Sequence, residues 1–143
     1  MTARALLDLP VRLHGIQLGR SADLLLDRDE LRAVGLDVVC GDDVHRFLPL
    51  AAAAVGADEV SLSSPLVLLE EDELAFYRKR TLSLDEIRGQ PVRRKARDLG
   101  IVRDLVLNAD LTPAAVVVEA GGVERTVPFE SSLRFSPGSR SAA

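Results

Sequence analysis

An internal repeat is the feature of this 143-residue sequence that most constrains its fold, because a duplication makes two segments adopt one structure. When the sequence is shifted against itself by 81 positions, residues 10–27 align with residues 91–108, and eight of these 18 positions are identical. Residues 38–50 align with residues 117–129 at an offset of 79, after two residues are removed from the intervening loop. We therefore predict two copies of one module. The matched positions include Pro10 and Pro91, Gly19 and Gly100, Asp23 and Asp104, and Pro49 and Pro128.

Short strands and tight turns are predicted within each copy. In the second copy, residues 99–107 form an apolar, β-branched run that is typical of a strand. Residues 114–119 are followed by Gly121-Gly122 and by the alternating residues 123–129, which together predict a β-hairpin.

The first copy repeats this hairpin. Residues 36–40 and residues 44–50 flank a predicted turn at Gly41-Asp42-Asp43. Five or so short strands per copy, with turns about every 8 to 12 residues, are typical of a small antiparallel barrel. A barrel of this size has a thin core, so we expect the two copies to pack against each other.

Proline and glycine positions refine the prediction. Pro49 and Pro128 cannot donate to a strand ladder, so each is expected at a strand end or on an edge strand. Gly19 and Gly100 are expected at a bend or bulge, where a curved small sheet tolerates no side chain.

The segment between the copies is predicted to contain a short helix over residues 71–80, because acidic residues begin it and basic residues end it. The alternative for this segment is a continued strand. Leu74 and Tyr77 are expected to share its buried face. Residues 66–69, just before it, form an apolar run that is typical of a strand. The predicted organisation is a first module over residues 1–69, a linker helix over residues 70–80, a second module over residues 81–135 and a disordered tail over residues 136–143.

The repeated pattern of Pro-Val, Leu-Gly, Val-X-Asp-Leu-Val-Leu, a Gly-rich turn and a final Val-Pro-Phe resembles the PRC-barrel family. The resemblance covers residues 87–129 well and residues 6–50 less cleanly, since Asp8 stands where the second copy has Gly89. It implies a mainly β fold of two small antiparallel, SH3-like barrels in tandem. The family includes the cytoplasmic part of the photosynthetic reaction centre H subunit, the C-terminal domain of the bacterial ribosome-maturation factor, and modules that accompany magnesium-transporter-type domains. The resemblance implies a barrel that serves as a docking surface and has no catalytic residues.

Composition narrows the class of protein further. No apolar run reaches the roughly 18 to 20 residues that a membrane-spanning helix needs, and no signal-peptide core follows Met1, so we expect a cytoplasmic protein without membrane insertion. The single cysteine, Cys40, excludes an internal disulfide framework and multi-cysteine metal motifs. Only two of the 18 basic residues are lysine, which suggests a GC-rich bacterial genome.

The titratable residues do not form an evident catalytic constellation, so we expect no enzyme activity and no cofactor. Neither His14 nor His45 is repeated in the second copy, and both are interpreted as surface or hairpin residues. Cys40 is interpreted as a buried or half-buried structural thiol. Asp42-Asp43 is typical of a turn and Glu70–Glu73 of a helix start, so no metal site is predicted.

The distribution of charge offers the sharpest candidate for an interaction site. The net charge is −4, with −8 on residues 1–77 and +4 on residues 78–143. A cluster that we call the basic strip consists of Arg88, Arg93, Arg94, Lys95 and Arg97. Such a strip can bind phosphate or an acidic partner, although no aromatic residue for base stacking occurs from Pro91 to Pro128. The alternative, which we favour, is that the basic strip faces Glu70–Glu73 or other acidic residues of the first module.

Together these features predict a non-catalytic module that positions or assembles another macromolecule, with another protein as its partner. RNA binding or ribosome assembly through the basic strip is one alternative. A cytoplasmic accessory or sensor of magnesium transport is the other. A homodimer, in which acidic and basic modules meet across two chains, is also compatible with the charge distribution.

Overall fold

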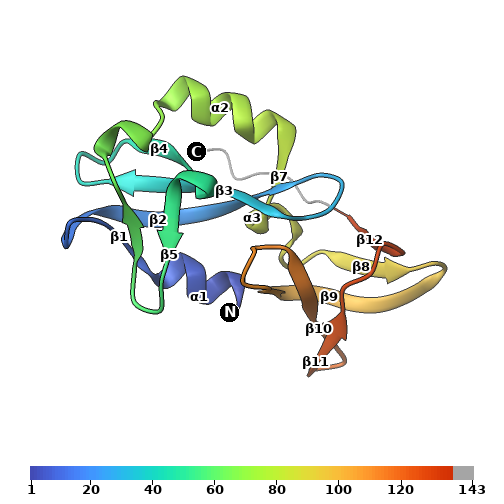
Figure 1. Cartoon of the computed structure of the whole chain (residues 1–143). Coiled ribbons are helices and arrows are strands. Elements are labelled where there is room, and N and C mark those ends of the chain that lie inside the picture. The colour runs from blue at the N-terminus through green and yellow to red at the C-terminus, as the bar shows by residue number, and fades with distance from the viewer. Residues whose placement is uncertain (137–143) are drawn as a thin grey trace.

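The protein, described over residues 1–136 by a computed structural model, is mainly β and contains two sheets (Figure 1). The strands of the first sheet are β1 (Pro10–Leu13), β2 (Ile16–Asp27), β3 (Ala33–Cys40), β4 (His45–Pro49), β5 (Ala53–Val55), β6 (Val60–Leu62) and β7 (Thr81–Ser83). Their order is β4-β3-β2-β1-β6-β5, with β7 paired to β2, and the sheet curls into a half-barrel. Its pairs are antiparallel except for β1 with β6.

The second sheet is antiparallel and has five strands in the order β11-β10-β9-β8-β12. Its strands are β8 (Pro91–Arg94), β9 (Arg97–Leu107), β10 (Pro113–Ala120), β11 (Val123–Pro128) and β12 (Leu133–Phe135). The helices are α1 (Ala3–Asp8), α2 (Glu71–Arg80) and α3 (Leu84–Ile87), and two 3-10 turns are η1 (Leu50–Ala52) and η2 (Pro65–Val67). The expected helix over residues 71–80 is therefore present as α2, which lies over the first sheet (Figure 1).

The strand pairings repeat from one sheet to the other at the spacing that the sequence predicts. Val11 of β1 pairs with Gly19 of β2, and Val92 of β8 pairs with Gly100 of β9. In both hairpins the register then shifts by one residue, which marks a bulge at the same place. The run β1 to β4 thus corresponds to the run β8 to β11.

The sequence alignment is wrong by one position in the third strand of each run. Leu24 pairs with Leu36 in the first sheet, and the corresponding Leu105 pairs with Val116 in the second. This pairing relates β3 to β10 by 80 positions rather than by 79.

The physical reason lies in the hairpin turns. The amide of Cys40 donates to the carbonyl of Val44 across a three-residue turn. In the second copy, Ala120 pairs with Val123 across the two-residue turn Gly121-Gly122. Because the turn of the first copy has one more residue, the offset between the copies is 80 in the third strands, β3 and β10, and 79 in the fourth strands, β4 and β11. An alignment that places no gap in the turn therefore shifts the third strand by one position.

Close packing of the backbone explains the two matched glycines. A Cβ atom at Gly19 would lie 2.4 Å from the carbonyl oxygen of Val39, and one at Gly100 would lie 2.5 Å from that of Glu119. The prediction that no side chain fits there is confirmed. Pro49 and Pro128 end β4 and β11, the outermost strands on that side of each sheet, where a missing N–H is tolerated. Both expectations for the prolines are confirmed.

Each copy supplies a segment that extends the long central strand of the other. Leu82 of β7, just before the second copy, pairs with Leu26 of β2 in the first. Reciprocally, the carbonyl of Met1 accepts a 2.8 Å hydrogen bond from the amide of Leu107 in β9. Met1 and Leu82 are 81 positions apart, as are Leu26 and Leu107. The two copies have therefore exchanged the segments that precede their first helices.

The helices that follow these segments are also held reciprocally. The amide of Asp85 in α3 donates to the carboxylate of Asp23 in β2 at 3.2 Å. The amide of Arg4 in α1 donates to the carboxylate of Asp104 in β9, also at 3.2 Å. The first turn of a helix leaves its amides without partners inside the helix, and here each is met by an aspartate of the other copy.

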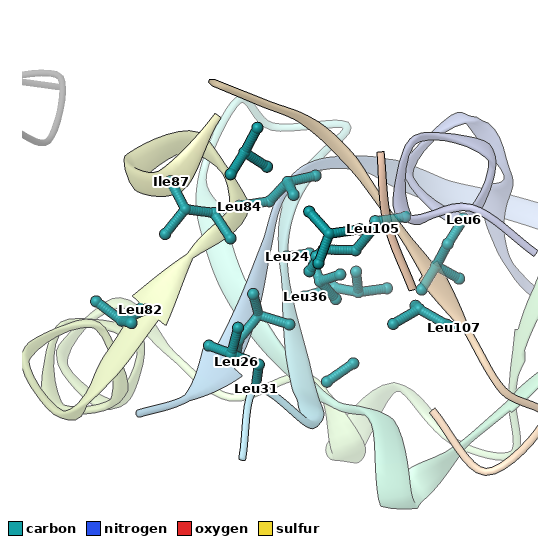
Figure 2. Close-up of a cluster of buried hydrophobic side chains, with 14 of the residues drawn as sticks. Leu6, Leu24, Leu26, Leu31, Leu36, Leu82, Leu84, Ile87, Leu105 and Leu107 are labelled. Carbon is teal, nitrogen blue, oxygen red and sulfur yellow. The ribbon is translucent and has the colours of Figure 1, made fainter. Parts of the chain in front are cut away.

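A single hydrophobic core joins the two copies. Leu24 and Leu105, which are equivalent, are both fully buried in one cluster that includes residues from both sheets. Figure 2 shows these two near the centre, with Leu6 of α1 on one side and Ile87 of α3 on the other. Burying one shared core provides the stability that a module of about 60 residues lacks alone.

Helix α2 covers the outer face of the first sheet with a second, smaller cluster. Leu74 packs against Leu25 and Phe47, and the Tyr77 ring stacks on Phe47 with centroids 4.2 Å apart. The expectation that Leu74 and Tyr77 share a buried face is confirmed. Gly35 lies beneath the Phe47 ring, since a Cβ atom there would come within 2.1 Å of it.

The apolar run before α2 is not the predicted strand. Pro65–Val67 forms η2, in which the hydroxyl of Ser64 accepts a hydrogen bond from the amide of Leu66. Leu66 is 87% exposed, and only Leu69 pairs with a strand, through two backbone hydrogen bonds to Phe47. Proline favours the start of a helical turn, and this local preference overrides the apolar pattern.

Two further findings concern the whole chain. Among residues 1–136, no helix has the length and apolar character that spanning a bilayer requires. Ser136 follows β12, and the rest of the predicted tail, residues 137–143, lies outside the described residues.

Candidate interaction surface

Four of the five residues of the basic strip lie on the β8–β9 hairpin. Lys95 is in the turn, with a φ of 58°. Arg93, Lys95 and Arg97 are exposed, whereas Arg94 is half-buried. The fifth member, Arg88, follows α3 and donates from Nε to the carbonyl of Arg103 at 3.2 Å. The hairpin therefore gathers four cations at one end of the second sheet, while Arg88 is tied to the backbone of β9.

The two faces of this hairpin carry different charge patterns. Arg93 pairs with Asp98 in β9 and with Arg134 in β12. Directly paired residues project to the same face of a sheet, so these three side chains form a row across three strands. Arg134 was not among the predicted site residues, because it follows the basic strip by about 40 positions and is recruited only by strand pairing.

Glu130 partly neutralises the positive charge on the opposite face of the hairpin, which carries Arg94. Its Oε1 atom accepts a 2.9 Å hydrogen bond from Arg94. The Arg94 guanidinium holds the pKa of the Glu130 carboxyl below its usual value, with help from Ser132.

The Asp98 carboxylate accepts a 3.1 Å bond from the amide of Gly100. Arg93, Lys95 and Arg97 form no ion pair within residues 1–136, so they are the charges that a partner can reach.

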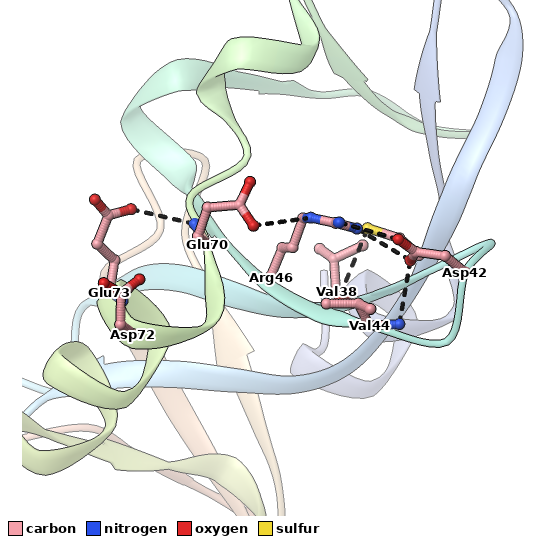
Figure 3. Close-up of polar contacts among 8 residues, drawn as sticks. Val38, Asp42, Val44, Arg46, Glu70, Asp72 and Glu73 are labelled. Atoms are coloured by element: carbon pink, nitrogen blue, oxygen red, sulfur yellow. Dashed lines mark hydrogen bonds and ion pairs between the residues drawn. The ribbon is translucent and has the colours of Figure 1, made fainter.

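The acidic residues that were expected to face the basic strip have other partners (Figure 3). The Glu73 carboxylate accepts a 3.1 Å bond from the amide of Glu70, within the capping box that begins α2. The Glu70 carboxylate lies 3.7 Å from Nε of Arg46, which also binds Asp42 through two bonds of 3.1 and 3.0 Å. Arg46 lowers the pKa of Asp42.

The expectation that the basic strip faces the acidic first module is therefore wrong for the described part of the chain. The acidic run begins α2 on the first sheet, where its carboxylates meet the free amides of the helix start. The basic hairpin belongs to the second sheet, and its one ion pair within residues 1–136 is to Glu130 of the same copy.

Sequence reasoning missed a buried polar cluster under α2. The side chain of Asp37 in β3 is fully buried, accepts a bond from the Arg78 guanidinium of α2 and lies 2.8 Å from Nδ1 of His45. The equivalent position in the second copy is the apolar Val117. A charged residue within the apolar run of residues 36–39 was the available signal. The cluster anchors α2 and explains why His45 has no counterpart in the repeat.

The remaining residues that could have a catalytic or metal-binding role, His14 and Cys40, lie in different turns and strands of the first sheet. His14 is in the β1–β2 turn with a φ of 50°, and Cys40 is half-buried, as expected for both. Cys40 lines a shallow hollow with Asp42, Arg46 and Glu70. Within residues 1–136, no group of three or more His, Cys, Asp or Glu side chains is placed to hold a metal ion.

Comparison with known proteins matches the chain to no family model and to no curated protein. The resemblance to the PRC-barrel family therefore stays a prediction.

Proposed function

We propose that this protein is a non-catalytic interaction module made of two PRC-type barrels in tandem. The proposal is supported by the repeated strand registers, by the curled first sheet and by the resemblance that the repeated sequence pattern carries. On this proposal the shared core and the exchanged segments make the pair a rigid frame, and function belongs to the surface that this frame presents.

The β8–β9 hairpin is the surface that we assign to the partner, and the partner that we assign is an acidic segment of another protein. The observation that supports this is that Arg93, Lys95 and Arg97 are exposed together and form no ion pair among residues 1–136. Cationic side chains on a rigid sheet attract an acidic segment of a partner. They determine the orientation in which that segment binds more than the strength of the complex.

RNA is the second candidate, and one observation favours it. Arg93 and Arg134 are paired on neighbouring strands, so two cations lie next to each other on one face, and cations are what binding to a phosphate backbone requires. Residues 91–128 contain no aromatic side chain on which a base could stack, so we rank RNA below an acidic protein.

A charge-reversal experiment separates these outcomes. Fluorescence anisotropy is measured with two probes, a polyglutamate peptide and a single-stranded oligouridylate. The variant carries Arg93→Glu and Arg97→Glu, and the control carries Arg20→Glu and Arg32→Glu, which are exposed arginines of the first copy.

The proposal predicts that the peptide binds, that added salt weakens the complex, and that the hairpin variant lowers the affinity by about tenfold or more while the control does not. If the oligouridylate binds more tightly than the peptide, the partner of the hairpin is RNA rather than an acidic protein segment. If neither probe binds, or if both variants reduce binding equally, the hairpin is not the interaction surface.

A further inference from the structure

The outer edge of β4 in the first sheet is covered by another segment of this chain. The amide of Phe47 donates to the carbonyl of Leu69 at 2.9 Å, and the amide of Leu69 donates to the carbonyl of Phe47 at 2.8 Å. The next residue of the segment, Glu70, meets Arg46, with 3.7 Å between its carboxylate and Nε of the arginine (Figure 3). One extended segment thus satisfies an edge strand through its backbone and an arginine through its acidic side chain.

The equivalent strand of the second sheet, β11, has an open edge. Within residues 1–136, β11 pairs with β10 alone and ends the strand order of its sheet. Alternate residues of an antiparallel strand bond the same neighbour. The amide of Phe129 donates to the carbonyl of Ala114, so the odd-numbered residues of β11 bond β10, whereas Glu124 and Thr126 direct their N–H and C=O groups outward. Thr126 is the equivalent of Phe47, and its outward groups await a strand.

Arg125 of β11 lacks both ionic partners that its equivalent has. Arg46, 79 positions earlier, binds Asp42 in the preceding turn and lies near Glu70. The turn before Arg125 is Gly121-Gly122, which offers no carboxylate. Arg125 is exposed and forms no ion pair within the described residues. The second copy therefore keeps the arginine of this arrangement but not the acidic groups that meet it in the first.

The side chains of β11 define what an added strand should carry. Paired residues of antiparallel strands project to the same face, so the residue opposite Arg125 should be acidic. Val127 is only 6% exposed, which favours an apolar residue opposite it. Glu124 is exposed and projects to the face opposite that of Arg125, because successive side chains of a strand alternate. The residue that pairs with Glu124 should therefore be neutral or basic.

We propose that the outer edge of β11 binds an extended segment of a partner protein in which two apolar residues are followed by an acidic residue and then by a neutral or basic one. The segment adds an antiparallel strand to the second sheet. Its backbone exchanges two hydrogen bonds with Thr126, and its acidic side chain binds Arg125. The β8–β9 hairpin lies towards the other end of this sheet, so the site is separate from the surface assigned above.

The test uses a fluorescein-labelled peptide that copies residues 64–71 of this chain, which include the segment that covers β4. It carries the change Glu71→Lys, because Glu124 would lie opposite that position. Fluorescence anisotropy measures its affinity for the whole protein. The proposal predicts saturable binding, and binding about fivefold weaker or more for a control peptide that also carries Glu70→Lys. No saturable binding, or equal affinity of the two peptides, overturns it.

Arg125→Glu tests the ion pair from the side of the protein. We expect it to weaken binding of the first peptide by about fivefold or more and to strengthen binding of the Glu70→Lys peptide, because the two charges are then exchanged. Arg20→Glu, at another exposed arginine, is the control and should change neither affinity. If the charge exchange restores no binding, Arg125 does not meet the acidic residue. If the Arg93→Glu and Arg97→Glu protein loses the peptide, the site is the hairpin instead.

Thr126→Pro tests the backbone bonds. Proline removes the outward N–H and keeps the bonds to β10, and prolines occur on edge strands at such positions. We expect about tenfold weaker binding or more, whereas Thr126→Val, which keeps the amide, should bind like the parent. Circular dichroism verifies that both variants fold, and the charge exchange at Arg125 decides if Thr126→Pro does not. A folded Thr126→Pro protein with the affinity of the parent contradicts the added strand.

Amide hydrogen exchange locates the peptide on the protein. In the protein alone, the Thr126 amide should exchange fast and the Phe47 amide slowly, because only the latter is bonded across its edge. The peptide should slow exchange at Thr126 and leave Phe47 unchanged. Protection of Thr126 that rises with protein concentration would show a second copy at this edge. Protection in the dilute protein alone would show that another part of this chain covers it. Either result contradicts the proposal.

Discussion

The carboxylate of Asp23 accepts a 3.2 Å hydrogen bond from the backbone amide of Asp85, which lies 62 positions further along the chain. It also accepts a 2.9 Å bond from the amide of Leu24, so one buried side chain serves a strand of the first copy and a helix of the second. Asp104 repeats both bonds, to Arg4 and to Leu105. These two aspartates therefore connect the copies in both directions.

Replacing Asp23 by alanine removes the acceptor for two amides in a buried place. We expect Asp23→Ala to lower the free energy of unfolding by about 1–3 kcal/mol, as measured by urea denaturation. Asp104→Ala is the companion variant, and its loss should be smaller because Asp104 is less buried. An Asp23→Ala protein as stable as the parent would show that the bonds to α3 do not hold the copies together.

The same residue predicts a pH dependence. Burial raises the pKa of Asp23 above its ordinary value of 3.8, although the amides of Asp85 and Leu24 oppose the shift. Between 3.8 and the raised value the folded protein binds more protons than the unfolded one, so this group stabilises the fold at acid pH. That stabilisation is lost as the pH rises through the folded pKa.

Asp23→Asn isolates this effect, because asparagine does not titrate. The difference in unfolding free energy between the parent and Asp23→Asn should fall as the pH rises above 3.8 and become constant once the pH exceeds the folded pKa. Urea denaturation of both proteins in a pH series provides the measurement. A difference that grows with pH in this window would mean that the folded pKa is lowered instead.

Gly35 should be intolerant of a side chain. A Cβ atom there would lie 2.1 Å from the Phe47 ring, which stacks on Tyr77 of α2. Gly35→Ala must therefore displace the Phe47 ring and disturb the stacking contact that holds α2 on the sheet. We expect a loss of about 1–3 kcal/mol in thermal or urea unfolding. The control is Ala115→Gly at the equivalent position of the second copy, which should cost about 0.5–1 kcal/mol through backbone entropy alone. Equal losses in the two variants would contradict this account of α2.

Arg78 should stabilise the fold because it compensates the buried negative charge of Asp37. Arg78→Met leaves the Asp37 carboxylate, which is fully buried, with His45 as its remaining partner, and we expect a loss of about 2–3 kcal/mol. Adding Asp37→Val, which copies Val117 of the second copy, removes the buried charge and should recover most of that stability. A double variant no more stable than Arg78→Met would show that Asp37 is not the reason.

Glu130 offers a gain-of-function prediction for the hairpin. Its carboxylate pairs with Arg94, and Glu130→Gln removes the negative charge while keeping the shape of the side chain. We expect the polyglutamate peptide to bind several-fold more tightly to this variant at low salt, with the gain reduced at high salt. Anisotropy titrations at two salt concentrations measure it. Unchanged affinity would indicate that Arg94 does not face the partner.

Local patterns in the sequence predicted the local structure well. The repeat and its matched glycines are visible when the sequence is compared with itself, and the helix over residues 71–80 follows from the charge order of its two ends. Residues 66–69 were misassigned because an apolar run alone does not distinguish a strand from a 3-10 turn that begins at Pro65.

Features that depend on distant pairing could not be predicted. The exchange of segments places Leu82 beside Leu26, and nothing in either local sequence indicates which partner is chosen. Arg134 joins the row of Arg93 only through the pairing of β12 with β8. Proline stands at position 113 where the first copy has Ala33, and this difference is found only when the copies are superimposed by strand register.

Differential scanning calorimetry of the whole chain tests most directly whether the two copies form one interlocked unit. The account predicts a single transition whose calorimetric and van't Hoff enthalpies agree, and it predicts that Asp23→Ala and Asp104→Ala each move that whole transition to lower temperature. Two separate transitions, with each substitution lowering only one of them, would contradict it.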